Sequence, residues 1–329
     1  MSDAAPQLEG QTLPSRDLDR ATGVINRIID NVERVIYGKR EAIERVLVGL
    51  LADGHVLLED VPGVGKTMLA RALALSINAD FRRIQFTPDV LPADVTGSST
   101  FNQGTHDFEF RRGPIFAHII LADEINRTSP RTQSSLLEGM EERQVTIDGI
   151  TYPLPNPFFV LATQNPIEHQ GTYELPEAQL DRFMLRVRIG YPSVAEESDI
   201  LEAQREANPV HKLAHVCETS DIAELQQLTR TVFVKPSLRR YVAEISAASR
   251  THPDVQVGIS VRGSQLLMAG AQAFAIISHR SHVIPDDIQA LALACLSHRL
   301  VLHPEARLSG VTEADVVASV LRQVQVPVQ

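Results

Sequence analysis

The sequence predicts an α/β protein with a parallel central sheet flanked by helices, followed by a smaller, all-helical lid domain. Three short apolar runs of strand length each end in polar residues, which is typical of buried parallel strands. A glycine-rich loop directly follows the first run, and beyond residue 191 apolar residues recur at helical spacing. A chain of 329 residues is long enough for both domains.

The segment before the first strand predicts an arm and two helices. Residues 1–17 are rich in small and polar types, include Pro6 and Pro14, and are expected to form a flexible arm. Apolar residues then recur at helical spacing in "DRATGVINRIIDNVERVI", and Gly38 marks a break before a second helix. We expect the α/β domain over residues 18–191 and the lid over residues 192–329.

The stretch "HVLLEDVPGVGKTMLARAL" predicts a strand, a phosphate-binding loop and a helix. Gly63 and Gly65 allow consecutive backbone N–H groups to point at phosphate oxygens, at a helix N-terminus that favours anions. Lys66 adds a positive charge, and the Thr67 hydroxyl can bind a magnesium ion that bridges the phosphates. A glycine-rich turn with an incidental lysine is the alternative. The predicted nucleotide-binding residues are Val61, Pro62, Gly63, Val64, Gly65, Lys66, Thr67 and Met68.

The loop departs from the pattern G-x-x-x-x-G-K-[ST] at its first position, where Asp60 replaces glycine. Asp60 lies where the strand ends, so its carboxylate can turn outward. We therefore expect this acid to alter the rim of the loop more than the phosphate cradle.

Two further apolar runs predict strands whose ends lie beside the loop. "HIILADE" ends in Asp123, expected to hold Mg²⁺ through water, and in Glu124, expected to polarise the attacking water. "FFVLATQN" ends in Asn165, which can orient that water. Taken alone, the acids could be caps of the next helix and Asn165 a turn former; after the phosphate loop, the acidic pair indicates a site.

Composition limits the other function classes. The formal net charge of −10 argues against nucleic-acid binding through the whole surface. Charges interrupt every apolar run before it reaches membrane-spanning length, and the start shows no basic run followed by an apolar core, so we expect a cytoplasmic protein without a membrane span. Cys217 and Cys295 form no CxxC pair and are expected to be structural.

The order of these signals resembles the MoxR-type AAA+ ATPases. The resemblance covers roughly residues 20 to 310 and implies an AAA+ P-loop NTPase fold with a helical lid. Its more specific part lies in "DEINR", "EGMEERQV" and "NPIEHQGTYELPEAQLDRF", which generic AAA+ proteins lack. The matching stretches are "LLEDVPGVGKTMLARAL", "ILADEINRTSPRTQSSLLEGMEERQV", "FVLATQNPIEHQGTYELPEAQLDRF" and "GISVRGSQLLMAGAQAFA".

The resemblance also implies roles for single residues. Asn165 is similar to the first sensor, and Arg262 in "VRGS" to the second sensor, which reaches nucleotide from the lid. Arg182 in "LDRF" resembles the arginine finger given to the neighbouring subunit's nucleotide. A surface salt bridge is the alternative for Arg182, and Arg127 is a weaker competitor for the finger role.

At the level of the whole protein, the resemblance implies an ATP- and Mg²⁺-dependent ATPase that assembles into a homo-oligomeric ring, expected to be a hexamer. Residues 94–113 resemble the insertion in the second helix of this clade, and a hairpin over about 144–154, turning at Asp148-Gly149, resembles the one before the first sensor. A plain surface flap is equally compatible with 94–113. The implied function is chaperone-like remodelling of partners, expected to include a von Willebrand factor A domain protein. The alternatives are a magnesium-chelatase-type or nucleic-acid motor subunit, and a non-hydrolysing nucleotide-sensing scaffold.

Overall fold

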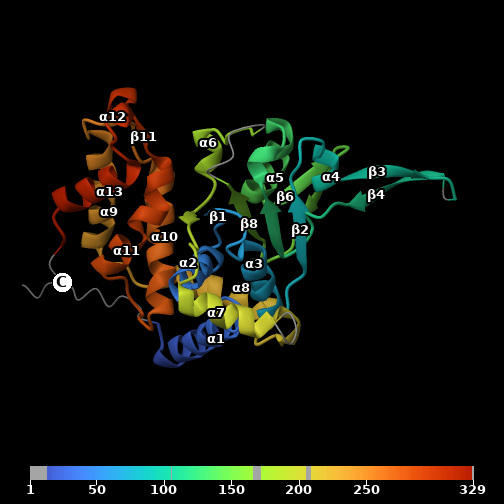
Figure 1. Ribbon diagram of the computed structural model, residues 1–329, viewed down its shortest axis with the longest axis horizontal. Helices are drawn as coiled ribbons and strands as arrows, with labels where there is room; N and C mark the ends of the chain where they lie inside the picture. The colour runs from blue at the N-terminus through green and yellow to red at the C-terminus, as the bar shows by residue number, and fades with distance from the viewer. Residues whose placement is uncertain (1–12, 105, 166–171, 205–208, 328–329) are drawn as a thin grey trace, which may run out of the picture.

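The computed structural model describes residues 13–104, 106–165, 172–204 and 209–327, and it contains an α/β body beside a helical body (Figure 1). The predicted arm over 1–17 lies mostly outside these residues, but its last part is helical because α1 already begins at Ser15. Residues 166–171 of the quoted stretch "NPIEHQG" also lie outside the described part of the chain.

The α/β body is built on a five-stranded parallel sheet of order β2-β5-β8-β1-β9. The three predicted apolar strands form its centre, and two arginine-containing strands that the apolar pattern did not indicate form its edges. The strands are β1 (Val56–Glu59), β2 (Phe81–Gln85), β5 (Ile119–Asp123), β8 (Phe159–Gln164) and β9 (Leu185–Val187).

Alternate residues of the central strands enter two different cores, because successive side chains of a strand point to opposite faces of the sheet. In β5, Ile119 and Leu121 pack with α1, α2, α3 and the C-terminal helices, whereas Ile120 and Ala122 pack with α5. The first of these cores is continuous from the sheet into the lid, where it includes Leu291 and Val320. The helices of this body are α1 (Ser15–Glu33), α2 (Arg40–Leu51), α3 (Lys66–Ser76), α4 (Pro92–Thr96), η1 (Ile125–Arg127), α5 (Pro130–Glu142) and α6 (Glu177–Leu180).

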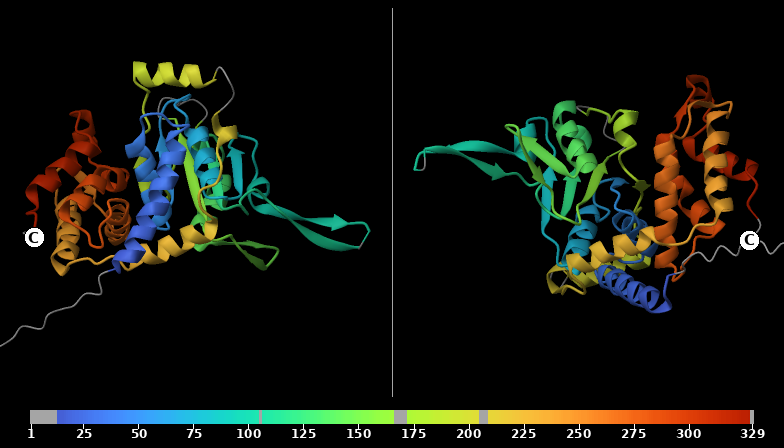
Figure 2. Two further views of the ribbon diagram at one scale, coloured as in Figure 1. Left: turned by 90° about the horizontal axis from the view of Figure 1, so that it is seen from below. Right: turned by 180° about the vertical axis from the view of Figure 1, so that it is seen from behind.

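Two β-hairpins extend from the α/β body. The longer one pairs β3 (Gly97–Asn102) with β4 (Asp107–Arg112) and projects far from the sheet (Figure 2). The shorter one pairs β6 (Gln144–Ile147) with β7 (Ile150–Pro153). Asp148 and Gly149 both have positive φ at its turn, which matches the mirror-image two-residue turns that favour this dipeptide.

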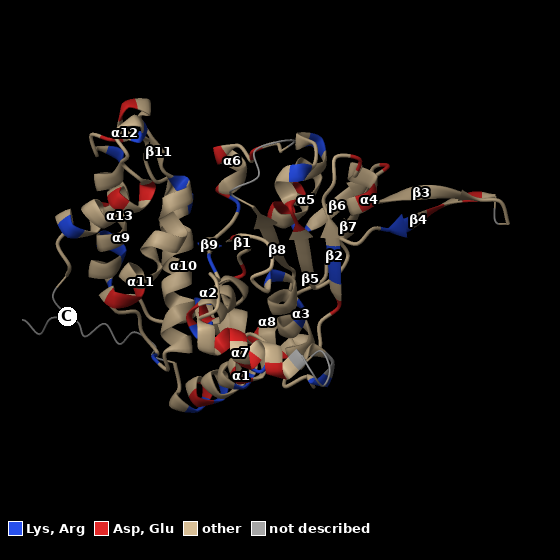
Figure 3. Cartoon of the chain, viewed as in Figure 1, with Lys and Arg blue, Asp and Glu red and all other residues tan. Residues whose placement is uncertain are grey.

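In the described residues, the C-terminal part is mostly helical and contains a small antiparallel pair, β10 (Val255–Val257) with β11 (Val301–Leu302). The segment after β9 first runs along the α/β body, where the Gln226 side chain donates to the Leu50 carbonyl (2.8 Å). Acidic residues mark α7 in this segment (Figure 3). The separate helical body begins only at α9, which is later than the boundary proposed at residue 192 (Figure 1). The C-terminal helices are α7 (Val194–Gln204), η2 (Pro209–Lys212), α8 (Thr219–Arg230), α9 (Pro236–Arg250), α10 (Val261–Ile277), α11 (Pro285–Leu296), η3 (Ser297–Arg299), α12 (Pro304–Leu308) and α13 (Glu313–Gln323).

Among the described residues, we find no helix that is both long and apolar enough to cross a membrane.

Candidate nucleotide-binding site

The glycine-rich loop connects β1 to α3 in the conformation that the sequence predicted. Gly63 and Gly65 have φ of 88° and 95°, values that side chains disfavour, and α3 begins at Lys66. Lys66 Nζ donates to the Asp60 carbonyl oxygen (2.6 Å). Partial burial lowers the pKa of Lys66, while Asp123, Asp60 and Glu124 oppose that change. The loop therefore places its amide groups and a lysine next to a cluster of acids.

The Asp60 side chain does not turn outward, so our expectation for this residue was wrong. It is buried, and Oδ2 accepts hydrogen bonds from the backbone N–H groups of Ile189 (2.8 Å) and Gly190 (2.7 Å). Oδ1 accepts a third from Val61 N–H (3.0 Å). A glycine could not make these bonds. Asp60 thus joins the phosphate loop to the chain that leaves β9.

The acidic pair lies at the end of β5, next to the loop. Asp123 Oδ1 accepts from the Thr163 hydroxyl (2.6 Å), and the same hydroxyl accepts from Glu124 N–H (2.8 Å). Glu124 has φ of 56°, a left-handed conformation at which the strand ends. Thr163 therefore fixes the position of both acids relative to β8.

Side chains that the sequence analysis missed hold these acids in the present conformation. From β2, Arg83 donates to Asp123 Oδ2 (2.6 and 3.0 Å), and Gln85 donates to Glu124 Oε2 (2.9 Å). Arg127 also pairs with Glu124 (3.1 Å). Arg127, the competitor for the finger role, thus forms an ion pair with Glu124 of its own chain. Both acids are engaged by neighbouring side chains.

These groups surround one cavity of about 400 Å³, so the ends of β1, β5 and β8 converge as predicted for a parallel sheet. Within the described residues, no three His, Cys, Asp or Glu side chains are close enough to hold a metal ion alone. A hydroxyl and a carboxylate do fit Mg²⁺, which usually keeps several waters and binds together with substrate phosphates. The cavity is lined by Pro62, Gly63, Gly65, Lys66, Thr67, Met68, Arg83, Asp123, Glu124 and Asn165.

A second cavity, of about 520 Å³, shares Gly63, Gly65 and Met68 with the first. Its remaining walls come from the turn between α1 and α2, the chain after β9, α7 and η2, and most of these residues are apolar. A cavity of this kind beside a phosphate site suits a nucleotide base. Val64 lines this cavity, whereas Val61 lines neither. The residues that only the structure identifies here are Val35, Ile36, Tyr37, Lys39, Gly190, Pro192, Ile200, Ala203 and Pro209.

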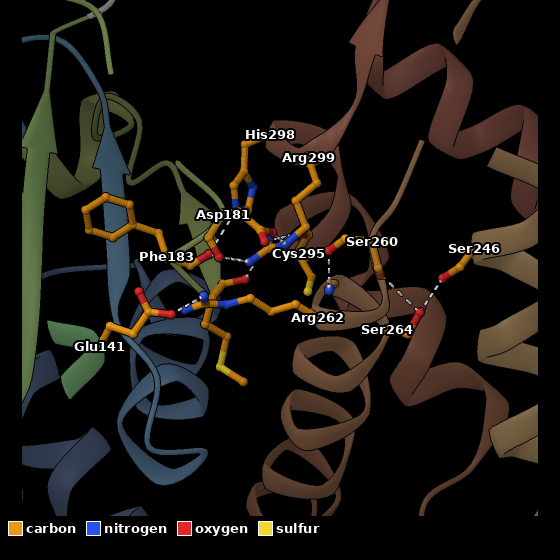
Figure 4. A network of polar contacts seen from close by, with 12 residues as sticks. Glu141, Asp181, Phe183, Ser246, Ser260, Arg262, Ser264, Cys295, His298 and Arg299 are labelled. Atoms are coloured by element: carbon orange, nitrogen blue, oxygen red, sulfur yellow. Dashed lines mark hydrogen bonds and ion pairs between the residues drawn. The ribbon is translucent and has the colours of Figure 1, made fainter. Parts of the chain in front are cut away.

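Arg182 and Arg262 line neither cavity, and both pair with Glu141 near the end of α5. Figure 4 shows the pair of Arg262 with Glu141. Arg182 Nε is 3.2 Å from Glu141 Oε2, and Arg262 Nη1 is 2.7 Å from Oε1. The prediction that Arg262 reaches nucleotide from the lid therefore has no support within this subunit. The two arginines therefore share one carboxylate of their own chain.

Comparisons with known proteins agree with this geometry. Residues 55–185 match the family described as "ATPase family associated with various cellular activities (AAA)", and residues 247–320 match the AAA lid domain. Together these matches contain the phosphate loop, the acidic pair, Asn165, Arg182 and Arg262. The fold, the loop and both matches define an AAA+ ATPase.

Relatives narrow the class. The chain is 54% identical over 306 residues to the uncharacterized protein YeaC of Bacillus subtilis, covering 93% of this chain and 96% of YeaC. It is 40% identical to the chaperone MoxR1 of Mycobacterium tuberculosis, covering 98% and 88% of the two chains. A crystal structure of a candidate ATPase from Cytophaga hutchinsonii superposes with a TM-score of 0.90 at 38% identity, covering 95% of this chain and 98% of that one. The chain belongs to the MoxR-type AAA+ ATPases.

Proposed function

We propose that this protein hydrolyses ATP with Mg²⁺ and uses the cycle to remodel partner proteins, in the manner of a chaperone. The observation that supports this most directly is the single cavity that joins Lys66, Asp123, Glu124 and Asn165 from three neighbouring strand ends. Those are the cation, the metal carboxylate, the base and the orienting amide that phosphoryl transfer to water requires.

In this mechanism the adenine base of ATP occupies the larger cavity, and its phosphates lie on the loop amides at the start of α3. Lys66 leaves the Asp60 carbonyl for the phosphate oxygens, and Thr67 and Asp123 would hold Mg²⁺. When bound, this ion would supply positive charge to the phosphates. Glu124 Oε takes the proton of the attacking water, which Asn165 orients. Glu124 must first exchange its contacts with Gln85 and Arg127 for the water.

Arg182 and Arg262 belong in this proposal to the site of the neighbouring subunit in a homo-oligomeric ring, which we expect to be hexameric. Neither arginine lines the two cavities at the phosphate loop of its own chain, which supports a role for both in trans. An arginine from a neighbour makes hydrolysis depend on assembly, because it supplies charge only in the ring. The hairpins β3–β4 and β6–β7 would then face the client, for which we propose a von Willebrand factor A domain protein.

One experiment tests both ATP hydrolysis and the role of the arginines in trans. ATP hydrolysis is measured against protein concentration, with particle size from light scattering on the same samples with and without ATP. We expect specific activity to rise with assembly. Activity that is the same in monomer and ring would contradict the role in trans.

The pairing of both acids with arginines also favours a second candidate, a nucleotide-sensing scaffold in which ATP orders the ring and turnover is incidental. A Glu124→Gln variant distinguishes the two functions. It should bind ATP, assemble and fail to support the client if hydrolysis provides the work. Full client activity would favour the scaffold.

A further inference from the structure

Arg299 of η3, a buried side chain of the lid, contacts the segment that contains Arg182 (Figure 4). This guanidinium donates to the backbone carbonyl oxygens of Asp181 (3.1 Å), Phe183 (2.6 Å) and Met184 (3.3 Å). Arg182 is thus flanked on both sides by residues whose carbonyl groups accept from the same lid side chain. We call residues 181–184 the finger segment.

An ion pair adds to this contact. Arg299 Nε lies 2.8 Å from Asp181 Oδ1, although its N–H does not point along a hydrogen bond. The Arg299 side chain is only 2% exposed, and burying a charge so fully is costly unless partners surround it. Here the partners are one carboxylate and several carbonyls of the finger segment. The buried guanidinium charge of Arg299 is therefore stabilised mainly by that segment. His298 supports the arrangement, since its Nε2 lies 3.0 Å from the Phe183 carbonyl oxygen.

On the lid side, Arg299 is held against the helices that surround it. It also donates to the Cys295 carbonyl at the end of α11. Gly263, the residue after Arg262, leaves room for it: a Cβ there would lie 3.0 Å from Arg299 Cδ. Arg299 therefore contacts both the finger segment and the start of α10, the two places from which Arg182 and Arg262 reach Glu141.

We propose that Arg299 is a positioning residue. Through it, the lid of one subunit fixes the position of that subunit's Arg182, which acts on the nucleotide of the next subunit. The inference rests on the proposed role of Arg182 in trans. When nucleotide moves the lid, the finger segment has to follow, because its carbonyls and Asp181 are bonded to that lid side chain. A movement of one subunit's lid thereby changes where its Arg182 lies in the neighbour's active site.

The test uses full-length Arg299→Lys, which keeps the charge but loses the planar fork that serves several carbonyls at once. We expect kcat to fall about 100-fold, as for a catalytic group misplaced by about 1 Å, with ATP affinity and ring size unchanged. Asp181→Asn should lower kcat by a smaller factor, because the hydrogen bonds from Arg299 to the carbonyl groups remain. Ser297→Ala is the matched control: it removes a different bond between η3 and β9, the one from Arg186 (3.1 Å), and should leave kcat unchanged.

A mixing experiment separates positioning from damage to the fold. Glu124→Gln subunits cannot hydrolyse ATP but retain an intact Arg182, so they should restore turnover to Arg299→Lys subunits in mixed rings, as they should to Arg182→Ala subunits. A subunit whose own site or fold is damaged cannot be rescued by a neighbour's arginine. Where Arg299→Lys does not assemble, Asp181→Asn takes its place under the same criteria.

The outcomes are distinct. Wild-type kcat in Arg299→Lys, or rescue of Arg182→Ala without rescue of Arg299→Lys, overturns the positioning role and leaves the proposed function intact. Failure to rescue Arg182→Ala itself, in rings shown to be mixed, overturns the role of Arg182 in trans. Rescue of both variants supports the proposal.

Discussion

Restoring the usual glycine at the first position of the phosphate loop should damage this protein. In Asp60→Gly, the backbone N–H groups of Val61, Ile189 and Gly190 lose a charged acceptor. Hydrogen bonds to charged groups contribute about 1.5–3 kcal/mol each. Ile189 is buried, whereas Gly190 and Val61 can partly regain water, so we expect a total loss of about 3–5 kcal/mol in the free energy of unfolding. Lys66 keeps its contact, because it binds the Asp60 backbone carbonyl.

The assay is urea unfolding followed by far-ultraviolet circular dichroism, since the chain contains no tryptophan. Asp60→Asn is the graded control: it keeps one oxygen for Ile189 and Gly190 and should lose only about 1–2 kcal/mol. ATP affinity, measured by calorimetry, should fall in the order wild type, Asn, Gly, because the loop loses its link to Gly190 in the wall of the 520 Å³ cavity. An unchanged unfolding midpoint in Asp60→Gly, or equal losses for Asn and Gly, would refute this reasoning.

Four further predictions follow from the same geometry. Lys66→Ala should weaken ATP binding at least about tenfold, which calorimetry measures, because about 1.4 kcal/mol corresponds to that factor. Glu124→Gln should keep ATP affinity within about twofold while abolishing phosphate release, so a large loss of affinity would argue against its role as base. Burial raises the pKa of the Cys217 thiol to about 12 and that of Cys295 to about 11, so neither should react with a thiol reagent at pH 8 until urea unfolds the chain; rapid labelling of the native protein would contradict this. Burial holds the pKa of His55 and His298 well below 6.5, so as pH falls the unfolded state takes up protons before the folded state does. The free energy of unfolding should therefore fall as pH drops below 6.5. His55→Gln and His298→Gln should each make the free energy of unfolding depend less steeply on pH.

The sequence predicted the centre of the sheet better than its edges. β1, β5 and β8 are apolar runs that end in polar residues, so the order of these runs was enough to place the phosphate loop, Asp123, Glu124 and Asn165 together. β2 reads "FRRIQ" and is mostly exposed, so neither apolar content nor alternation marks it. Because β2 was missed, Arg83 and Gln85 could not be placed beside the acids.

Contacts between distant segments explain what else the sequence could not predict. The walls of the 520 Å³ cavity come from the turn between α1 and α2, the chain after β9, α7 and η2, and no local pattern joins them. Two of the three partners of the Asp60 side chain are backbone amides about 130 residues further along, for which side-chain identity gives no signal. Arg299 was invisible for a related reason, since its acceptors are mostly carbonyl groups.

The hydrophobic core that passes from the sheet into the lid has a mechanical consequence. Residues from β1, α2, α10 and α11 share one interior, so the lid is not a flap on a flexible tether. Close-packed interiors resist deformation and change mostly by small sliding steps of helices. We therefore expect the lid to move over short distances against a stiff interior rather than to swing freely.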